Sequence, residues 1–403
     1  MNTRILFLSF YYPPDLAAGS FRAEALVKAL LAAGGDKVQV DVITTLPNRY
    51  HVFNMPTLAC EETAGLRIRR IATPSHRSGF VDQARAFLAF ARGARKLIQD
   101  EHYDLIVASS SRLMTATLGA LFARRHKTPL YLDIRDIFVD TLPDLFPSTF
   151  GKLATLIFSW VERWTINQAA QVNLISPGFL AYFKLRYPHK SFSLHTNGVD
   201  DLFLEPVPLL ESPVRSGPVQ VLYAGNIGTG QGLHHILPPL AKRLEGEVHF
   251  RVIGAGSAVD KLSQALSSTG VNNVELLPPM KRSDLLDLYQ RADVLFLHLN
   301  KFRAFRRVLP SKLFEYAATG KPIWAGLSGY SAKLTSSKIN NAALFKPCDV
   351  DDAVDAFRKL ALRSVCRAEF IDSYSRRSIN KLMARDVLST PGYRLHRLPS
   401  GKR

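Results

Sequence analysis

A thirteen-residue segment at 310–322, PSKLFEYAATGKP, carries the side chains of this 403-residue chain that are best suited to chemistry. Ser311 is a candidate N-cap, and Gly320 predicts the end of a short helix. Lys312 and Glu315 are then held near the helix N-terminus, where free N–H groups attract phosphate. An acid beside a phosphate site is expected to bind another group, such as a ribose hydroxyl. The segment therefore predicts a site for a nucleotide diphosphate.

Two glycine-rich loops precede this segment. GNIGTGQG, at 225–232, has four glycines in eight residues and lacks the Lys and Ser/Thr of a Walker A motif. Its backbone N–H groups can converge on phosphate, which we favour over the alternative of a flexible turn. GAGSAV, at 254–259, is a partial dinucleotide fingerprint with Val259 in place of a third glycine. A tight turn explains the second loop equally well, so NAD binding is not expected.

A basic run leads into the segment. Lys301, Arg303, Arg306, Arg307 and Lys312 are five cations without an acid between 300 and 312. A solvated loop is the alternative for any one of them. Together, beside a helix N-terminus, they are suited to hold a diphosphate leaving group.

The elements that position these residues form two series of alternating strands and helices. The first series runs from RILFLSF at 4–10 to SFSLHTNG at 191–198, and the second from VQVLYAG at 219–225 to ALFKP at 343–347. Continuous apolar strands separated by helices indicate parallel sheets covered on both faces. The proline-rich stretch 200–217 is typical of a linker. We therefore predict an α/β fold with two Rossmann-like, doubly wound domains facing a cleft, at 1–199 and 218–366.

Composition limits the class of protein. The formal charge of +18 implies an anionic partner, either nucleic acid, anionic lipid or a phosphorylated substrate. The three scattered cysteines fit neither a zinc site nor a disulfide framework, which predicts a reducing, cytoplasmic setting. The apolar run at 5–10 is too short for a signal peptide, and no run reaches the roughly 18 apolar residues of a membrane span.

The motifs together resemble those of the retaining GT-B glycosyltransferases of family 4. Within that family the chain is most similar to the bacterial branch for O-antigen and capsular polysaccharide, including L-fucosamine-type transferases. The matching motifs, in family order, are FYYPPDLAAGSFRAEALVKAL at 10–30, DIRD at 133–136, YAGNIGTGQGL at 223–233, VIGAGS at 252–257, RADVLFL at 291–297 and PSKLFEYAATGKP at 310–322. The resemblance implies the GT-B fold, with a helix at 367–391 returning to the first domain before a basic tail at 392–403.

The resemblance also implies site residues. Glu315 matches the second glutamate of the family's Glu-x7-Glu pair, which is expected to hold the donor ribose. The implied donor-binding residues are Gly225, Asn226, Gly228, Gln231, Gly254, Gly256, Arg307, Ser311, Lys312, Leu313 and Glu315. The implied acceptor-binding residues are Gly19, Ser20, Arg135 and Asp136, and the implied catalytic residues are Lys312, Glu315 and Asp136.

The chain departs from the family pattern in three places. Arg307, eight residues before Glu315, replaces the first glutamate of the pair, so no acid there contacts the donor sugar. Asn226 and Gln231 stand where many members carry Arg and Lys, and Lys312 or the 303–307 cluster is expected to supply the charge. Arg135 stands where many members carry a histidine, and a buried ion pair with Asp136 is the alternative role for it.

The resemblance predicts transfer of an N-acetylated hexosamine or a deoxyhexosamine. The donor is expected to be a UDP-sugar, and the acceptor a polyprenyl-diphosphate-linked saccharide. Stabilising the departing diphosphate and orienting the acceptor are the main tasks, so neither a metal nor a cofactor is expected. Two alternatives remain, a nucleotide-sugar epimerase on the same fold and a non-catalytic protein that binds sugar nucleotide or lipid.

Two basic, aromatic stretches predict attachment to anionic lipid on the cytoplasmic face of the inner membrane. RAFLAFARGARKL, at 85–97, sets Phe87 and Leu88 beside Arg92 and Arg95, and LIFSWVERW, at 156–164, aligns Ile157, Trp160, Val161 and Trp164. Packing in the core or between helices is the alternative, and it is favoured for the second stretch. No RNA- or DNA-binding motif is present, so a nucleic-acid partner is not expected.

Overall fold

The computed structural model describes residues 3–15, 17–47, 57–74, 80–110, 112–146, 149–203 and 217–393. The chain divides into two compact units, Met1–Asn197 with Arg376–Arg403, and Gly198–Ser375. Each unit is an α/β domain with its own sheet, which confirms the predicted fold class.

The first unit is built on an eight-stranded sheet in the order β3-β4-β2-β1-β5-β6-β7-β8. Every strand pair is parallel except β3 with β4. The strands are β1 (Thr3–Leu8), β2 (Val38–Thr45), β3 (Cys60–Thr63), β4 (Leu66–Ile71), β5 (Leu105–Ser110), β6 (Leu130–Ile134), β7 (Gln171–Leu174) and β8 (Phe192–Leu194). The central strands β5 and β6 are buried along their whole length, as expected for a parallel sheet covered on both faces.

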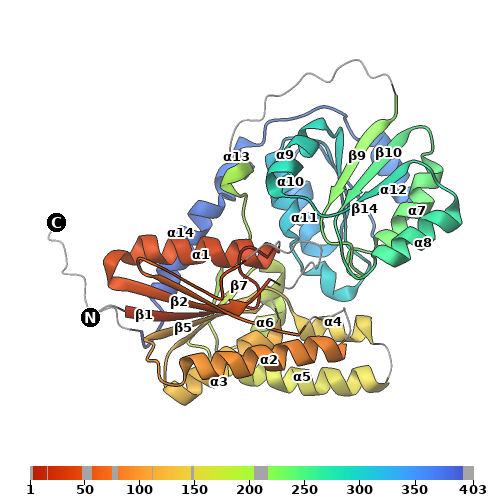
Figure 1. Ribbon diagram of the computed structural model, residues 1–403. Coiled ribbons are helices and arrows are strands. Elements are labelled where there is room, and N and C mark those ends of the chain that lie inside the picture. The colour runs from red at the N-terminus through yellow and green to blue at the C-terminus, as the bar shows by residue number, and fades with distance from the viewer. Residues whose placement is uncertain are drawn as a thin grey trace. The chain divides into compact units, whose positions relative to one another are not determined.

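Helices cover both faces of the first sheet. They are α1 (Ala18–Gly34), α2 (Phe80–Ile98), α3 (Leu113–His126), α4 (Phe138–Leu145), α5 (Thr149–Gln168), α6 (Leu180–Arg186) and α14 (Arg376–Leu388). Helices α1 and α14 pack together on one face, whereas α2, α3 and α5 lie on the opposite side (Figure 1).

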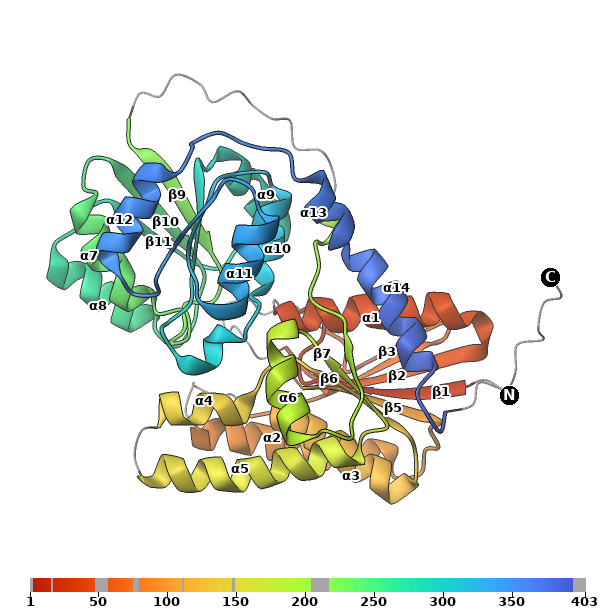
Figure 2. The same cartoon turned by 180° about the vertical axis from the view of Figure 1, so that it is seen from behind.

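The second unit is built on a six-stranded sheet in the order β11-β10-β9-β12-β13-β14, and all its strand pairs are parallel. Its strands are β9 (Val219–Ala224), β10 (Val248–Ile253), β11 (Val274–Leu277), β12 (Val294–His298), β13 (Ile323–Gly326) and β14 (Ala342–Phe345). Its helices are α7 (Leu233–Arg243), α8 (Val259–Thr269), α9 (Arg282–Arg291), α10 (Ser311–Ala318), α11 (Gly329–Lys338), α12 (Val350–Lys359) and α13 (Ala368–Ser373). Helices α7, α8 and α12 lie on one face of this sheet, and α9, α10 and α11 lie on the other (Figure 2).

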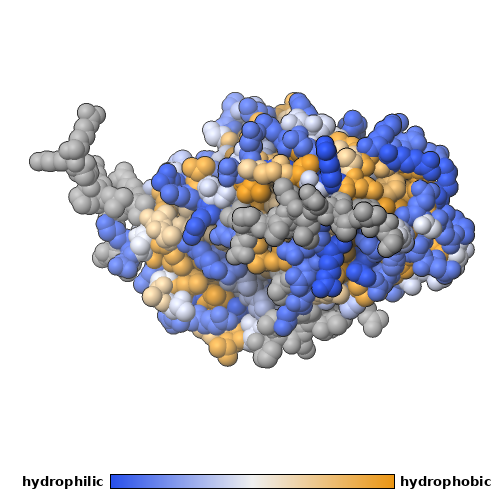
Figure 3. Space-filling view, turned by 90° about the horizontal axis from the view of Figure 1, so that it is seen from above, coloured by the Kyte–Doolittle hydropathy of each residue, from blue (hydrophilic) through white to orange (hydrophobic). Residues whose placement is uncertain are grey.

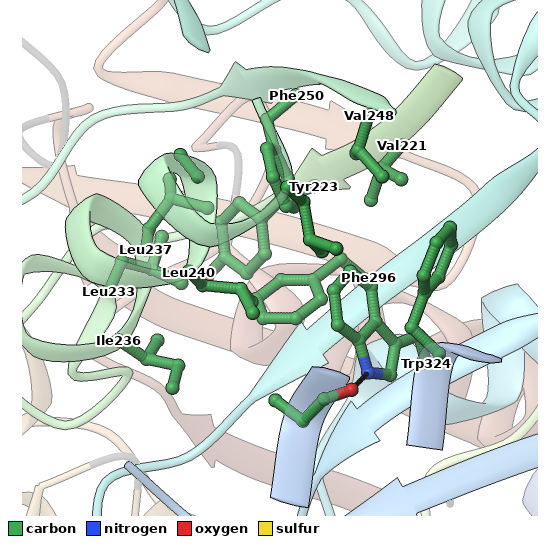
Figure 4. Packing of buried hydrophobic residues seen from close by; sticks show 14 of the residues in the cluster. Val221, Tyr223, Leu233, Ile236, Leu237, Leu240, Val248, Phe250, Phe296 and Trp324 are labelled. Carbon is green, nitrogen blue, oxygen red and sulfur yellow. Dashed lines mark hydrogen bonds between the residues drawn. The ribbon is translucent and has the colours of Figure 1, made fainter. Parts of the chain in front are cut away.

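The core of the second unit is centred on aromatic side chains. Trp324 on β13 is fully buried, and it packs edge-on against Phe296 of β12 at 5.1 Å and beside Phe250 of β10 (Figure 4). Its indole N–H donates a hydrogen bond of 3.0 Å to the carbonyl of Ala353 on α12. This bond satisfies the one polar atom that the indole brings into the core.

The helix that returns to the first unit is α14. It begins at Arg376, whereas the sequence placed the whole of 367–391 in this role. Helix α13 stays with the second unit because Phe370 packs in the same core as Phe314 of α10, with the ring centroids 6.1 Å apart. Positions 204–216 of the predicted linker and 394–403 of the predicted tail lie outside the described residues.

The surface is mixed in character. Hydrophilic and hydrophobic residues are interspersed on the face seen in Figure 3. None of the helices in the described part of the chain combines the length and the apolar character that crossing a membrane requires.

Candidate functional site

The strand order of the second sheet reverses between β9 and β12, which are neighbours although three helices separate them in sequence. In open α/β sheets ligands bind beyond the carboxyl ends of the strands at such a switch point. The loop after β9 is 225–232, and the chain after β12 leads through 299–310 into α10. The reversal therefore brings the first glycine loop, the basic run and the helix at 311–318 to one edge of the sheet.

Helix α10 begins at Ser311 itself, one residue earlier than an N-cap at Ser311 predicts, so the predicted capping role of Ser311 is wrong. The capping position is Pro310, which makes no side-chain hydrogen bond to the helix. Gly320 adopts φ 71° just beyond the helix, so the predicted stop is confirmed. Leu313 is fully buried in the core, where it positions the helix and has no surface for a ligand.

Lys312 and Glu315 are bonded to each other. The Lys312 ammonium donates a hydrogen bond of 2.7 Å to Glu315 Oε2 and another of 3.0 Å to the Tyr289 hydroxyl on α9. The Glu315 side chain is 8% exposed and that of Lys312 is 26% exposed. The sequence assigned Lys312 to the diphosphate and to catalysis, and its bond to Glu315 was not predicted. An opposite charge at this distance favours the ionised form of the nearly buried carboxylate.

Two further contacts hold α10 in place. The Tyr316 hydroxyl accepts a hydrogen bond of 3.0 Å from the Ala224 N–H at the end of β9. At the other end of the helix, Arg367 is buried and donates to the carbonyl of Ala317 at 3.1 Å. Helix α10 is therefore fixed to the start of the first glycine loop and at its own C-terminus.

Gln231 organises the first glycine loop from within. Its side-chain oxygen accepts a hydrogen bond of 2.8 Å from Asn226 Nδ2 and one of 3.1 Å from the Gly228 N–H. A Cβ at Gly228 would lie 2.6 Å from Asn226 Nδ2, so the absent side chain leaves room for this contact. Three of the predicted donor-binding residues therefore form one ordered turn.

The two glycine loops lie directly against each other. The N–H of Ile227 donates to the carbonyl of Ala255, and the N–H of Ala258 donates to the carbonyl of Ile227, both at 2.9 Å. Gly254 has φ 151°, and a Cβ there would lie 1.8 Å from the carbonyl oxygen of Gly225. A Cβ at Gly256 would lie 2.4 Å from the carbonyl oxygen of Ile227. These two glycines are thus required for the close approach of two backbones, whereas the sequence assigned them to the donor.

His298, at the end of β12, contacts the first glycine loop at the carboxyl edge of the sheet. It was not predicted from the sequence. It is fully buried, and its Nδ1 lies 2.6 Å from the carbonyl oxygen of Gln231. The neighbouring Asn300, also buried, donates from Nδ2 to the carbonyl of Thr229 at 3.0 Å. Both residues end or follow a buried apolar strand, which is the position where a sequence search for polar residues could have found them.

The basic run reaches the same edge. The short helix η4 (Arg303–Arg306) places the Phe305 ring against the first loop, where a Cβ at Gly230 would lie 2.9 Å from Cζ. Lys301, Arg303 and Arg306 are exposed, and Arg307 is half-buried. The structure therefore brings this positive segment beside the glycine loop, whereas the sequence placed it only beside a helix N-terminus.

In the first unit, the predicted acceptor residues are also brought together. The Arg135 guanidinium lies over the first turn of α1, so that a Cβ at Gly19 would be 2.4 Å from its Nη1. Ser20 is fully buried in the same turn. Asp136 has solvent-exposed surface, but desolvation of its carboxyl still raises the pKa to about 6, and the Arg135 charge acts against that shift. The ion pair with Arg135 therefore stays a prediction.

A buried network that the sequence analysis missed lies beneath these residues. Arg22 donates to both oxygens of Asp133, at 2.8 and 2.9 Å, and to the carbonyls of His195 and Thr196, each at 2.7 Å. Burial raises the pKa of Asp133, but the adjacent Arg22 guanidinium outweighs it and holds that pKa below its usual range. Asn173 completes the network by donating to Asp133 at 2.7 Å. The first aspartate of DIRD is thus a structural group that holds Arg22 and Asn173.

The described part of the chain contains no group of three or more His, Cys, Asp or Glu residues placed to hold a metal ion.

Two family models match the chain in succession. Residues 19–189 match "Glycosyl transferase 4-like domain", and residues 211–376 match "Glycosyl transferases group 1". Glycogen synthase of Mycobacterium tuberculosis is 24% identical over 340 residues, which cover 79% of this chain and 77% of that enzyme.

Solved structures share the fold. The crystal structure of WaaG, "a glycosyltransferase involved in lipopolysaccharide biosynthesis", superposes with a TM-score of 0.64 at 15% identity, covering 96% of both chains. HepE of Anabaena, solved in complex with UDP, superposes with a TM-score of 0.57 at 17% identity, covering 96% of this chain and 97% of that one. The order of the two matched domains and the two-sheet fold lead to one conclusion: the chain belongs to the GT-B glycosyltransferases of the family 4 type.

Proposed function

We propose that the chain is a retaining glycosyltransferase that moves an N-acetylated hexosamine or a deoxyhexosamine from a UDP-sugar to a polyprenyl-diphosphate-linked saccharide. The enzyme then acts in the synthesis of surface polysaccharide. It is attached peripherally to the cytoplasmic face of the inner membrane. The observation that carries the proposal is the Glu315 carboxylate, held by Lys312 on the helix that is bonded to the start of the first glycine loop. The UDP bound to HepE and the lipopolysaccharide role of WaaG support the choice of donor and pathway.

The Glu315 carboxylate is suited to hold the ribose of the donor. The Lys312 ammonium, 2.7 Å away, favours its ionised form, and an ionised carboxylate accepts hydrogen bonds from two vicinal hydroxyls. Its buried position strengthens such bonds, because the local dielectric is low.

The diphosphate is expected to meet backbone N–H groups and cations. Gln231 orders the glycine loop at 225–232 by accepting from the Gly228 N–H, so any phosphate contact there falls to the N–H groups that the loop does not use internally. The basic run supplies Arg303, Arg306 and Arg307. The Lys312 side chain is 26% exposed, and its ammonium adds positive charge at this edge of the sheet. These groups stabilise the leaving dianion, which is the largest charge that develops in the reaction.

Arg307 changes how the donor is held. It occupies the position of the family's first glutamate, so the sugar hydroxyls meet a cation there in place of a carboxylate. We expect the enzyme to bind its donor mainly through the nucleoside diphosphate. The acceptor is expected beside Gly19, Ser20, Arg135 and Asp136 of the first unit, with a β-phosphate oxygen of the donor taking the acceptor proton.

The test is transfer from a panel of UDP-sugars to a polyprenyl-diphosphate-linked saccharide, with UDP binding measured by calorimetry in parallel. Replacing Glu315 with Gln should lower kcat/KM by about tenfold or more, because a charged acceptor for two hydroxyls is lost. Glu369→Gln, an exposed acid on α13, is the matched control and should leave transfer unchanged.

Two results would contradict the proposal. Isomerised donor formed without any acceptor would identify an epimerase. Tight UDP binding without transfer to any acceptor in the panel would instead identify a non-catalytic sugar-nucleotide-binding protein.

A further inference from the structure

Helix α5 exposes a stripe of large apolar side chains. Leu153, Leu156, Ile157 and Trp160 are 55%, 69%, 53% and 70% exposed. Their spacing of three, four and seven residues places them on one face of the helix. Single exposed apolar residues are normal, but four large ones on the same face of one helix indicate a contact surface. We call these four residues the α5 stripe.

The inner face of α5 is already occupied, so the α5 stripe cannot turn inward. Phe158 packs edge-on against Phe138 of α4 at 5.1 Å, and the Thr165 hydroxyl lies 2.9 Å from that of Thr117 on α3. Glu162 is buried and accepts hydrogen bonds from the hydroxyls of Tyr182 and Tyr187 at 3.0 and 2.9 Å. Core packing, which the sequence favoured for Ile157 and Trp160, is therefore wrong for these two residues.

Exposed positive charge lies on the same side of the first sheet as the α5 stripe. Helices α2, α3 and α5 lie on the same side of the first sheet (Figures 1 and 2). Their exposed cations are Arg85, Arg92, Arg95, Lys96, Arg124, Arg125, Lys152 and Arg163. The three helices contain two carboxylates, of which Asp82 is half-buried and Glu162 is buried. The neighbouring α4 adds the half-buried Asp140 and Asp144, which leaves a clear excess of positive charge.

From this combination we infer that the α5 stripe and the cations of α2, α3 and α5 form a docking surface for an anionic lipid bilayer. The apolar side chains enter the interface between head groups and acyl chains, with Trp160 at the head-group level, and the cations contact lipid phosphates. A second copy of this chain fits poorly, because two such faces would bring like charges together. Nucleic acid would leave the α5 stripe exposed to water.

The inference deepens the proposed function, on which its purpose rests, because a polyprenyl-linked acceptor lies in a bilayer. It also separates this surface from the sugar-nucleotide site, which belongs to the second unit. Vesicle binding requires no donor, acceptor or turnover, so its failure and the failure of the proposed transfer are distinguishable.

The experiment is flotation of the full chain with vesicles of phosphatidylcholine alone or mixed with phosphatidylglycerol. We expect binding to the mixed vesicles that weakens with added salt, and little binding to neutral ones. The double variant Leu156→Ser with Trp160→Ser should weaken binding by about tenfold or more. Leu382→Ser is the matched control, since Leu382 is 55% exposed on α14, on the opposite side of the same sheet. It should bind as the unmodified chain does.

Trp160 also provides a direct signal. The chain has three tryptophans, of which Trp324 is fully buried and Trp164 is half-buried. Mixed vesicles should therefore shift the fluorescence to shorter wavelength, and Trp160→Phe should remove most of that shift while retaining binding. Circular dichroism establishes that each variant is folded.

Three outcomes would overturn the inference. The double serine variant could float as well as the unmodified chain, or Leu382→Ser could lose as much binding. Sedimentation could also show a dimer that the double variant dissociates, which would assign the α5 stripe to self-association.

Discussion

His298 and Gln231 are joined by a bond that determines the protonation of the histidine. A carbonyl oxygen only accepts, so His298 Nδ1 must donate to Gln231 across 2.6 Å. Nε2 is then free of hydrogen and accepts from the Cys348 N–H at 3.0 Å. Cys348 has φ 63°, and its thiol lies 3.4 Å from Asn300 Oδ1. One neutral imidazole therefore links the first glycine loop to the turn at 348.

The first prediction follows from this tautomer. Burial lowers the pKa of His298 to about 4, and the nearby His235 adds to the effect. The unfolded histidine binds its proton near pH 6.5, so stability is fully present above that pH and is lost as the pH falls towards 4. The loss of unfolding free energy should approach about 3 kcal/mol. His298→Asn can still donate to Gln231 but does not titrate, and it should lack this pH dependence in urea unfolding.

Exposed His102 provides the control for this measurement, and His102→Asn should keep the pH dependence of the unmodified chain. If the free energy of unfolding fell equally with pH for the unmodified chain and for His298→Asn between pH 6.5 and 4, another group would be responsible.

The second prediction concerns the contact between the two glycine loops. Gly254→Ala should destabilise the second unit by about 3 kcal/mol or more and abolish UDP binding, because its Cβ would overlap the Gly225 carbonyl. Gly217→Ala tests backbone strain alone, since φ is 122° and nothing lies within 4 Å of a Cβ there. Thermal unfolding and UDP titration measure both effects. If the two variants lost equal stability, the close approach would not be the cause.

The third prediction separates order in the first loop from its charge. Gln231→Glu keeps an oxygen for Asn226 Nδ2 and the Gly228 N–H but adds a negative charge beside the expected diphosphate. UDP affinity should fall by about tenfold while the melting temperature changes little. Gln220→Glu makes the same charge change at the far end of β9 and should bind UDP normally. Unchanged UDP affinity in Gln231→Glu would place the diphosphate elsewhere.

The fourth prediction concerns Arg367, which is not near the loops but supports α10. Its guanidinium donates to the carbonyls of Ala317, Lys321, Asn340 and Asn341 at 2.8 to 3.3 Å. Burial lowers its pKa to about 10, so it remains charged at neutral pH. Arg367→Lys keeps the charge but cannot reach all four carbonyls, and it should cost about 3 kcal/mol of unfolding free energy.

Urea unfolding measures this cost, with exposed Arg363→Lys as the control. A loss of less than about 0.5 kcal/mol for Arg367→Lys, the range of ordinary surface changes, would mean that the carbonyls find other donors.

Several features were predictable because they depend on neighbours in sequence. The alternation of strands and helices, a short helix within 310–322 and its stop at Gly320 all follow from local patterns. Periodicity predicts which residues of an element share a face, and glycine predicts where a helix ends, even when the segments that pack against them are unknown. The family motifs were likewise contained in short segments.

Tertiary structure alone decided which groups meet. Arg22 and Asp133 are 111 residues apart, and His298 and Gln231 are 67 apart, so no local pattern pairs them. Helical spacing predicted that Ile157 and Trp160 share one face of α5. It could not predict whether that face points outward, because the opposite face is set by long-range contacts such as those of Glu162 with two tyrosines of another segment. The sequence determined the elements and their chemistry, and long-range packing decided their partners, because a side chain's environment is made by residues distant in the chain.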